Sequence, residues 1–412
     1  MPPSTSSPFA WWWRILRFAL LGRPPAEPDE VVPWALCVPF RIWRLPKRPD
    51  GRSFRDSYTA NLPPLLRALL PARLLYLGFL LLWPLIAACR FLPDRRALWS
   101  ALLRPDLAML SPHPLPGERE VAWIRPDYAV GMFYAWEYAR HRPGHHRLDD
   151  KRSFVEACRA AGLPIPRSVP AAVAVAEGGA WIVKQPLADR GTGVWLLTAA
   201  ALAERADAKD LLVQERLRNH PGLAALLPPD APLSTLRVIT TLEHPGGTPR
   251  VTRVALRVGR AGRLTDNAAG GGLWAAVDVA TGRAGSALRR ATFLLRRDGA
   301  PVRDLVHPDS GKAFSAVTVP CLAEAQELAL KAHASLAPEA LTLGWDVALT
   351  ARGPLLLEVN LWAASYDDPP ADDAYGPLCR LIVARVAALG EGHGRVSSGG
   401  VAPPPAPAPR RR

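Results

Sequence analysis

The residues best suited to chemistry lie in one segment near the C-terminus, where apolar runs enclose Asp346, Glu358 and Asn360. If the turn of a β-hairpin centres on Arg352, Asp346 faces Glu358, and Asn360 lies on the same face two residues further on. Two carboxylates this close repel each other unless a cation lies between them, and oxygen ligands suit Mg²⁺. The spacing therefore predicts a Mg²⁺ site. A turn centred one residue away would move Asp346 to the opposite face of the hairpin.

A lysine within an apolar strand is the second chemical feature. Lys184 ends the run Trp181–Lys184, and a loop that contains Gly191, Thr192 and Gly193 follows it. An ammonium group beside the backbone N–H groups of a flexible loop can hold a polyphosphate. This is not a P-loop, because the lysine precedes the loop and neither GKS nor GKT is present. On these residues alone, an ordinary hairpin remains the alternative.

Three further segments carry polar residues in an apolar setting. One apolar strand ends in Gln214 and Glu215, and its backbone could hydrogen-bond the edge of an adenine, although an ordinary edge strand has the same pattern. Arg237 and Arg257 lie on the two strands of one expected hairpin. Asn267 begins a glycine-rich loop in which a substrate could approach the backbone closely.

The elements that must position these residues mix helices and strands without a strict βαβ alternation, which predicts an α+β fold. Asp149 or Asp150 is expected to cap a helix that runs to Ala161, and Gly162 ends it. Two more helices are expected over residues 198–207 and 322–336. The expected strands cover 181–185, 194–197, 211–217, 274–279 and 286–295, with hairpins formed by 235–242 and 250–258 and by 343–350 and 355–359.

In this order the motifs resemble an ATP-grasp protein, in particular the sugar-transfer-associated branch related to glutamate ligases. The resemblance covers about residues 148–390 and implies two α+β subdomains that clasp ATP with one or two Mg²⁺ ions, or with Mn²⁺ in their place. The motifs that carry it are Asp150-Lys151, Gly162–Pro166, Val183-Lys184, Gly191–Gly193, Gln214–Leu217, Asn219–Pro221, Leu233–Val238, Asn267 with Gly270-Gly271, Gly344–Asp346 and Glu358–Asn360.

The resemblance also implies roles by position. Lys151 and Lys184 would contact the ATP phosphates, and the Gly191–Gly193 loop would close over them. The adenine hinge would consist of Gln214, Glu215, Arg216 and Leu217. The residues that would steady the transferred phosphate or the acceptor are Arg237, Arg257 and Asn267. The metal ligands would be Asp346, Glu358 and Asn360.

The implied enzyme is a carboxylate–amine ligase-like protein that uses ATP and Mg²⁺ to activate a carboxylate as an acyl phosphate. An amine or hydroxyl then attacks, and the expected substrate is a small carboxylate or a sugar-linked molecule in cell-surface polysaccharide or sugar-conjugate biosynthesis. Two alternatives stay open. One is an ATP-grasp-type kinase that phosphorylates a hydroxyl, and the other is a catalytically weak, membrane-associated nucleotide-binding partner of a polysaccharide assembly system.

Residues 1–147 form a basic, apolar and Trp/Pro-rich region for which helices are expected, and they hold most of the net charge of +14. The segment Trp11–Leu21 combines tryptophans with arginines, as interfacial helices do. The uncharged run Leu74–Cys89 is shorter than the roughly 20 residues of a spanning helix. Two hypotheses follow: residues 1–100 contact a membrane surface, or they pack as core or as a lid on the catalytic domain.

The five cysteines are widely spaced and include no CxxC motif, which favours a reducing compartment. We therefore expect a cytoplasmic protein, or one held peripherally at the inner face of the membrane. No nucleic-acid-binding motif accompanies the basic charge, so no nucleic-acid partner is expected. Residues 391–412 are rich in Gly, Pro and Ala and are predicted to be a disordered tail.

Overall fold

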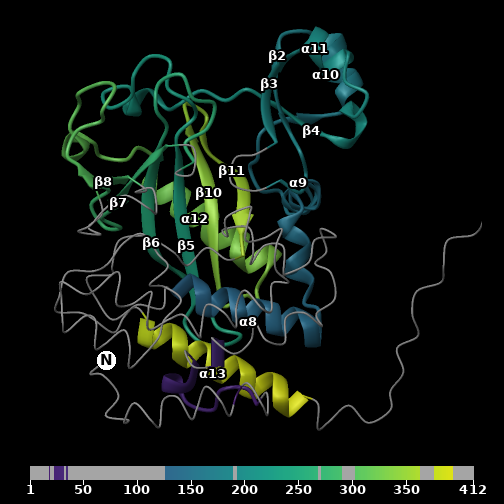
Figure 1. Cartoon of the computed structure of the whole chain (residues 1–412), viewed down its shortest axis with the longest axis vertical. Coiled ribbons are helices and arrows are strands. Elements are labelled where there is room, and N and C mark those ends of the chain that lie inside the picture. The colour runs from purple at the N-terminus through teal and green to yellow at the C-terminus, as the bar shows by residue number, and fades with distance from the viewer. Residues whose placement is uncertain are drawn as a thin grey trace, which may run out of the picture.

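The computed structural model describes residues 18, 23–31, 34–35, 126–188, 193–267, 271–289, 302–361 and 375–392, which contain two antiparallel sheets and their helices (Figure 1). Several predictions fall outside these residues. They concern the segments 11–21 and 74–89, the loop residues Gly191 and Thr192, and the tail beyond residue 392.

The smaller sheet has four strands in the order β1-β4-β2-β3. Its strands are β1 (Ser168–Val169), β2 (Ala180–Lys184), β3 (Val194–Thr198) and β4 (Leu212–Glu215). The helices α10 (Ala171–Glu177) and α11 (Ala199–Ala203) accompany it, and Figure 1 places this unit apart from the larger sheet. It has a hydrophobic core of its own, built from Ala174, Trp181, Val183, Leu202, Leu211 and Val213.

The larger sheet has seven strands in the order β11-β10-β5-β6-β7-β8-β9. Its strands are β5 (Thr235–Leu242), β6 (Pro249–Val258), β7 (Leu273–Val277), β8 (Ala284–Arg289), β9 (Val302–Asp304), β10 (Thr342–Thr350) and β11 (Gly353–Asn360). Helix α12 (Leu322–Leu336) packs against this sheet. All nine residues of β10 are buried, and between its terminal threonines the strand is apolar apart from Asp346.

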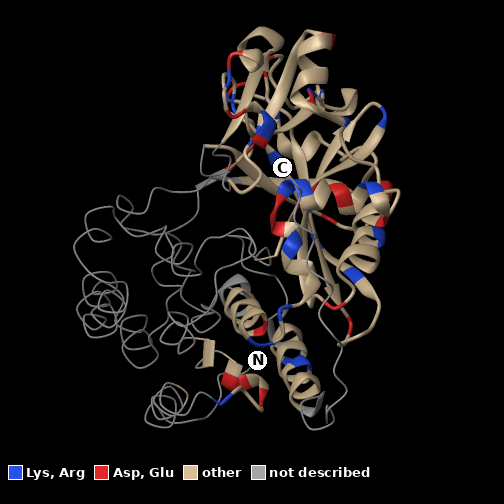
Figure 2. Ribbon diagram, turned by 90° about the vertical axis from the view of Figure 1, so that its right-hand side faces the viewer, with Lys and Arg blue, Asp and Glu red and all other residues tan. Residues whose placement is uncertain are grey.

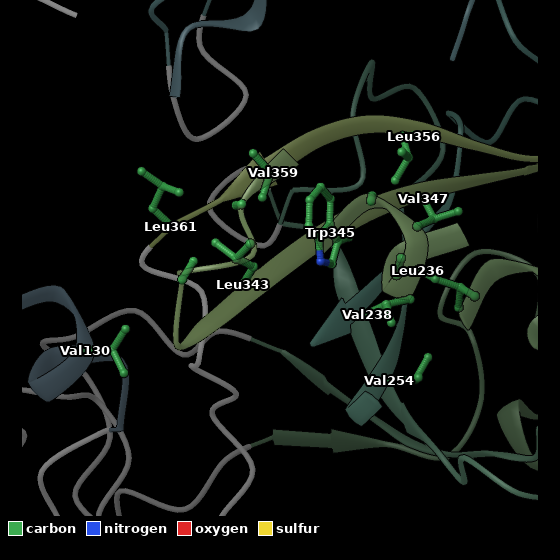
Figure 3. Packing of buried hydrophobic residues seen from close by; sticks show 14 of the residues in the cluster. Val130, Leu236, Val238, Val254, Leu343, Trp345, Val347, Leu356, Val359 and Leu361 are labelled. Carbon is green, nitrogen blue, oxygen red and sulfur yellow. The ribbon is translucent and has the colours of Figure 1, made fainter. Parts of the chain in front are cut away.

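Trp345 of β10 is fully buried within the core of the larger sheet, and Figure 3 shows Leu343, Val347 and Val359 around it. Its indole Nε1 donates a hydrogen bond to Thr240 Oγ1 at 2.8 Å. The same hydroxyl lies 2.7 Å from His333 Nδ1, and His333 Nε2 lies 2.9 Å from the Ala340 carbonyl. Burial lowers the pKa of His333 to about 4, so this histidine is a neutral part of the core.

Four helical segments complete the fold around the larger sheet. They are α8 (Pro126–His141), the 3₁₀ helix η3 (Gly144–Asp149), α9 (Lys151–Ala160) and α13 (Tyr375–Gly392), and Figure 1 shows α8 and α13 near each other below the strands. Asp150 caps α9, because its Oδ1 accepts a hydrogen bond from Ser153 N at 2.8 Å. Gly162, with φ of 63°, follows the helix as expected. Basic and acidic residues are interspersed over the described elements (Figure 2).

Helix boundaries differ from the expectations in two places. The helix expected over 198–207 begins at Ala199 and ends at Ala203, and the rest of the range holds the Arg205–Asp207 pair before a 3₁₀ turn (η4, Ala208–Asp210). Helix α13 runs to Gly392, so it includes the first two residues of the predicted tail. Buried residues of α8, such as Phe133 and Tyr134, share one hydrophobic core with the larger sheet. The domain boundary at residues 147–148 stays a prediction.

None of the helices in the described part of the chain has the length and apolar character needed to cross a membrane.

Candidate active site

The β10–β11 hairpin brings the two predicted acids face to face. Asp346 is paired with Glu358, and Gly344 is paired with Asn360. The pairing prediction is confirmed, but the predicted turn centre is wrong, because Thr350 pairs with Gly353 and leaves a two-residue turn. A β-bulge compensates: Val347 pairs with Leu356, so β11 has one residue more than β10 between this pair and the acids. The bulge thus keeps both acids on one face.

Two arginines hold Asp346. Arg237 lies opposite Asp346 on β5, and its Nε and Nη2 donate to the two carboxylate oxygens, the latter at 3.1 Å. Arg257 Nη1 of β6 donates to Asp346 Oδ2 at 2.6 Å. Arg257 Nη2 also donates to Asp266 Oδ1 at 3.2 Å, and Thr235 Oγ1 donates to Asp266 Oδ2 at 2.5 Å. We call Arg237, Arg257, Asp266 and Asp346 the arginine–carboxylate cluster.

The cluster is buried, and its pKa values reflect competition between burial and pairing. Burial acts to raise the pKa of Asp346, but the charges of Arg237 and Arg257 outweigh it and hold this pKa well below its usual range. Burial acts to lower the pKa of Arg257, but Asp266 and Asp346 raise it above its ordinary value. For Asp266, burial prevails over Arg257 and the pKa is raised. Asp346 is therefore a permanent anion between two permanent cations.

Asp266 is a residue of this site that the sequence analysis did not single out as functional. It lies directly before Asn267, whose carbonyl accepts a hydrogen bond from Gly272 N at 3.0 Å. A Cβ at Gly272 would lie 2.1 Å from the Asp266 carbonyl oxygen, so only glycine fits this close approach. The sequence did contain one signal for Asp266. Two arginines were expected on neighbouring strands with too few acids nearby, and a further carboxylate was needed to balance their charge. The role predicted for Asn267 stays a prediction.

The smaller sheet brings a lysine to the acids. Lys184 ends β2, and its charge interacts with Glu358, Lys151 and Asp346. Burial lowers the pKa of Lys184 to about 8, although Glu358 opposes this shift. Lys151, the first residue of α9, has its Nζ 3.8 Å from Glu358 Oε2 and donates to the Ala188 carbonyl. Both predicted phosphate-binding lysines thus lie beside the predicted metal ligands.

The loop after Lys184 closes tightly at its end. Gln185 N donates to the Gly193 carbonyl at 2.8 Å. Gly193 has φ of 65°, and a Cβ there would lie 2.6 Å from Gln185 Oε1. Glycine is therefore required at this position for both the backbone conformation and the space. The loop's role over the phosphates stays a prediction.

In the predicted adenine hinge, both side chains at the end of β4 have protein partners. Gln214 is buried, and its Nε2 donates to Ser168 Oγ at 3.0 Å. Glu215 Oε1 accepts hydrogen bonds from Arg167 N at 2.9 Å and from Arg352 Nη2 at 2.7 Å. Arg352 belongs to the β10–β11 turn, so this pair joins the two sheets. Arg216 is exposed and Leu217 is half-buried, and their predicted contacts with adenine stay predictions.

The donor set fits a hard divalent cation. Glu358 is the accessible carboxylate, with 36% of its side chain exposed, whereas 6% of the Asp346 side chain is exposed. Burial and the neighbouring Asp346 carboxylate raise the pKa of Glu358, as expected for two buried acids that lie close together. The side-chain amide nitrogen of Asn360 is buried and has no hydrogen-bond partner among the described residues. Glu358 thus keeps ligand capacity. Asn360 would bind a cation through its amide oxygen, and Asp346 would have to share oxygens that already accept hydrogen bonds from arginines.

Comparison with known proteins connects part of this chain with the ATP-grasp family. Residues 195–365 match the family model described as Sugar-transfer associated ATP-grasp. This segment runs from β3 beyond the end of β11 and includes the arginine–carboxylate cluster, Glu358 and Asn360. The sequence resemblance to this family is therefore confirmed, and so is the predicted α+β fold class.

Solved structures that resemble the chain include three ATP-grasp or ribonucleotide synthase proteins. An N5-carboxyaminoimidazole ribonucleotide synthetase from Thermotoga maritima is 14% identical over 57% of this chain and 44% of its own, with a TM-score of 0.29. A RimK domain ATP-grasp protein from Sphaerobacter thermophilus is 14% identical over 72% of this chain and 76% of its own, with a TM-score of 0.30. A carboxyaminoimidazole ribonucleotide synthase from Aspergillus clavatus, complexed with ATP, is 14% identical over 61% and 57%, with a TM-score of 0.37. No curated protein matches the sequence.

Proposed function

We propose that this chain binds ATP with Mg²⁺ between its two sheets and activates a carboxylate as an acyl phosphate, which an amine or a hydroxyl then attacks. One observation carries the proposal: Lys184 of the smaller sheet and the Asp346–Glu358 pair of the larger sheet interact, although they come from separate hydrophobic cores. A nucleotide between the two sheets would have its phosphates at this junction.

The charges at the junction suit a magnesium polyphosphate. Four cations, Lys151, Lys184, Arg237 and Arg257, surround three carboxylates, Asp266, Asp346 and Glu358. The arginines are already neutralised by Asp266 and Asp346, so the lysines are the groups available to phosphate oxygens. Glu358 and Asn360 would hold the metal, with Asp346 sharing its oxygens, and Mg²⁺ would offset the charge on the phosphate groups.

In the proposed reaction a substrate carboxylate oxygen attacks the γ-phosphorus, the bond to the β,γ-bridging oxygen breaks, and ADP leaves. The amine or hydroxyl then attacks the acyl carbon and releases inorganic phosphate, and its proton passes to solvent or to a nearby base. Lys151 and Lys184 would hold the phosphates in line, and Arg237 and Arg257 would keep Asp346 charged and fixed. The family description supports a substrate connected with sugar transfer. Within that class, we propose a substrate of cell-surface polysaccharide or sugar-conjugate biosynthesis.

A nucleotide assay with hydroxylamine tests the reaction class. Full-length protein is incubated with ATP, Mg²⁺ and hydroxylamine, with L-glutamate and D-glucuronate as carboxylate probes, and both ADP and hydroxamate are measured. Hydroxamate formed in step with ADP supports acyl phosphate chemistry. ADP release with a phosphorylated sugar and no hydroxamate would identify the kinase alternative. Lack of ATP binding by calorimetry in the presence of Mg²⁺ would overturn the proposal.

A peripheral membrane location remains part of the proposal through the composition of residues 1–100, which combine tryptophans with an excess of arginine. Co-sedimentation with vesicles that contain anionic lipid tests it, with neutral vesicles as the control. Binding to neither vesicle at low salt would leave the alternative in which these residues pack on the catalytic domain.

A further inference from the structure

A second cluster of buried polar side chains lies outside the candidate active site. Glu137 of α8 and His145 and His146 of η3 are 1%, 1% and 3% exposed. Each offers one ligand atom, and these three atoms lie within 4.8 Å of one another. We call these three residues the Glu–His–His cluster.

The cluster lies at the beginning of β10, whereas the active-site acid lies further along that strand. Tyr134 of α8 accepts a hydrogen bond from Thr342 N at 3.0 Å and donates to the Thr342 carbonyl at 2.7 Å. The Tyr134 ring packs edge-on against His145, with ring centroids 5.5 Å apart. Asp346 is four residues after Thr342, and a strand advances roughly 3.3 Å per residue, so about 13 Å separates the two positions. The Glu–His–His cluster is therefore a separate site.

The hydrogen bond between His145 and Glu339 determines which ring nitrogen of His145 carries the proton and which one faces Glu137. His145 Nδ1 lies 2.9 Å from Glu339 Oε1, at a distance at which an N–H donates to a carboxylate. The opposite ring nitrogen, Nε2, lies 3.9 Å from Glu137 Oε2. In a neutral imidazole with its proton on Nδ1, Nε2 carries a lone pair. Two acceptors then face each other across a gap too long for a hydrogen bond.

These two acceptor atoms are buried and have no hydrogen-bond partner within the described ranges. The other carboxylate oxygen of Glu137 accepts from Arg385 Nε of α13 at 3.2 Å, so only Oε2 is left toward His145. Leaving buried acceptors unsatisfied costs free energy, and a cation between them would remove that cost. Zinc ligands lie about 2.0–2.1 Å from the metal, which places tetrahedral ligand atoms roughly 3.3 Å apart. The observed 3.9 Å requires these two side chains to approach by about half an ångström, and a separation of 4.8 Å, the limit for the three ligand atoms, would have to close by about 1.5 Å.

His146 is positioned to add the third ligand. Its ring packs between those of His145 and Tyr138, with centroids 4.7 Å and 4.8 Å away. Two imidazoles and one carboxylate favour first-row transition ions over Mg²⁺ or Ca²⁺, which prefer oxygen ligands alone. A carboxylate behind a ligand histidine, as Glu339 is behind His145, is the usual outer partner in such sites.

We propose that Glu137, His145 and His146 bind one divalent transition-metal ion of the zinc type, with Glu339 orienting His145. Because all three ligands are buried, the ion would lie inside the protein, where it would join α8 and η3 at the start of β10. It would not take part in the nucleotide chemistry, whose candidate site offers oxygen ligands and lies further along β10. This inference does not depend on the proposed function.

The test uses tag-free, full-length protein treated with EDTA, desalted, and then titrated with Zn²⁺ in excess Mg²⁺, which occupies the oxygen-ligand site. We expect about one zinc per chain by elemental analysis, because the proposed cluster would hold a single ion. His145→Ala should abolish this binding, and Glu339→Ala should weaken it by about 10- to 100-fold, as loss of an outer partner does. His244→Ala, in the exposed β5–β6 turn, is the matched control and should bind as the unaltered protein does.

Substitution of Co²⁺ for zinc gives a second measurement that needs no variant. Visible absorption bands typical of Co²⁺ bound by nitrogen and oxygen ligands should appear in the unaltered protein and should be weaker in Glu339→Ala at limiting Co²⁺. Zinc binding well below one per chain in the unaltered protein would overturn the proposal, and so would equal affinity in His145→Ala. If His145→Ala does not fold, the other measurements decide. An unchanged zinc affinity in Glu339→Ala, together with no Co²⁺ bands in the unaltered protein, would also overturn the proposal.

Discussion

The two sheets contribute opposite kinds of charge environment to one site. In the larger sheet, Asp346 is buried between Arg237 and Arg257, and Arg257 is balanced again by Asp266. In the smaller sheet, Lys184 approaches the same acids but forms no close ion pair with any residue that the structure describes, and burial lowers its pKa to about 8. The larger sheet thus holds its charges paired before any ligand arrives. The smaller sheet presents a poorly solvated cation. Binding of an anion beside it would stabilise the charged form of this lysine.

The contrast teaches that stability and ligand affinity are separable in this protein. Removing a charge from the larger sheet leaves buried partners without compensation. Removing Lys184 eliminates the free-energy cost of burying its charge. It also removes a group that would contact the phosphates of bound ATP. The predictions below test this contrast, beginning with the largest expected effect.

Asp346→Asn should destabilise the folded protein by about 3–5 kcal/mol, because it breaks a buried pair and leaves two arginines with one carboxylate. Urea denaturation followed by circular dichroism measures this change. The matched control is Glu177→Gln, which breaks the exposed pair with Arg167 and should have a much smaller effect. Similar losses in both variants would mean that the arginine–carboxylate cluster contributes no more than a surface pair.

Glu358→Gln should lower Mg²⁺-dependent ADP release by about 10²–10³-fold, the usual effect of removing one group that stabilises developing charge. Its fold should persist, because 36% of the side chain is exposed and Lys151, 3.8 Å away, also donates to Ala188. Steady-state kinetics at several Mg²⁺ concentrations give the result. Unchanged turnover in a well-folded Glu358→Gln protein would remove Glu358 from the metal site.

Lys184→Ala should weaken ATP binding by about 1.5–3 kcal/mol, the value of one charge-assisted contact, which corresponds to one to two orders of magnitude in Kd. Its stability should fall far less than that of Asp346→Asn, because Lys184 lies in the smaller sheet without an ion-pair partner at hydrogen-bond distance among the described residues. Calorimetric titration and denaturation are compared on the same samples. Equal Kd values for the two proteins would exclude Lys184 from the phosphate site.

The pKa of Lys184 predicts how ATP affinity changes with pH. The charged form binds phosphate, so affinity should be highest below pH 8 and should fall by at most about tenfold for each pH unit above it. Titrations at pH 7 and pH 9 measure this fall. Lys184→Arg is the control, because a guanidinium stays charged at both pH values. A fall of the same size in Lys184→Arg would assign the pH dependence to another group.

Arg352→Ala should change stability least, by about 0–1 kcal/mol, because its contact with Glu215 is a largely exposed pair with 63% of the arginine side chain accessible. This pair nevertheless joins the β10–β11 turn to β4, so its loss should show in ATP affinity if the two sheets must be held together. Calorimetry on Arg352→Ala checks this. Unchanged affinity would show that the contact does not couple the sheets.

The parts of the fold that depend on neighbouring residues could be predicted well. The helix over 322–336 was predicted with the bounds that it has, and the Asp150 cap and the β5–β6 hairpin were also expected. The short strand β1 and helix α10 were missed, because two residues are too few to show a strand pattern and the helix lies beside prolines and glycines. The centre of the β10–β11 turn was misplaced by less than one residue. The prediction assumed a regular hairpin, and a bulge has no distinct sequence pattern that would correct this assumption.

The sequence by itself determined the β10–β11 hairpin and the lysine in an apolar strand, since strand periodicity and turn chemistry act over a few residues. That Asp346 pairs with Glu358 depended also on the β-bulge, which the structure shows. Only the tertiary structure decided that Arg237 and Arg257 hold Asp346, because these contacts join positions 109 and 89 residues apart. The same holds for Glu137, His145 and Glu339, which come together from α8, η3 and the segment after α12. Contacts of this kind depend on how separate elements pack, and local patterns contain no information about that packing.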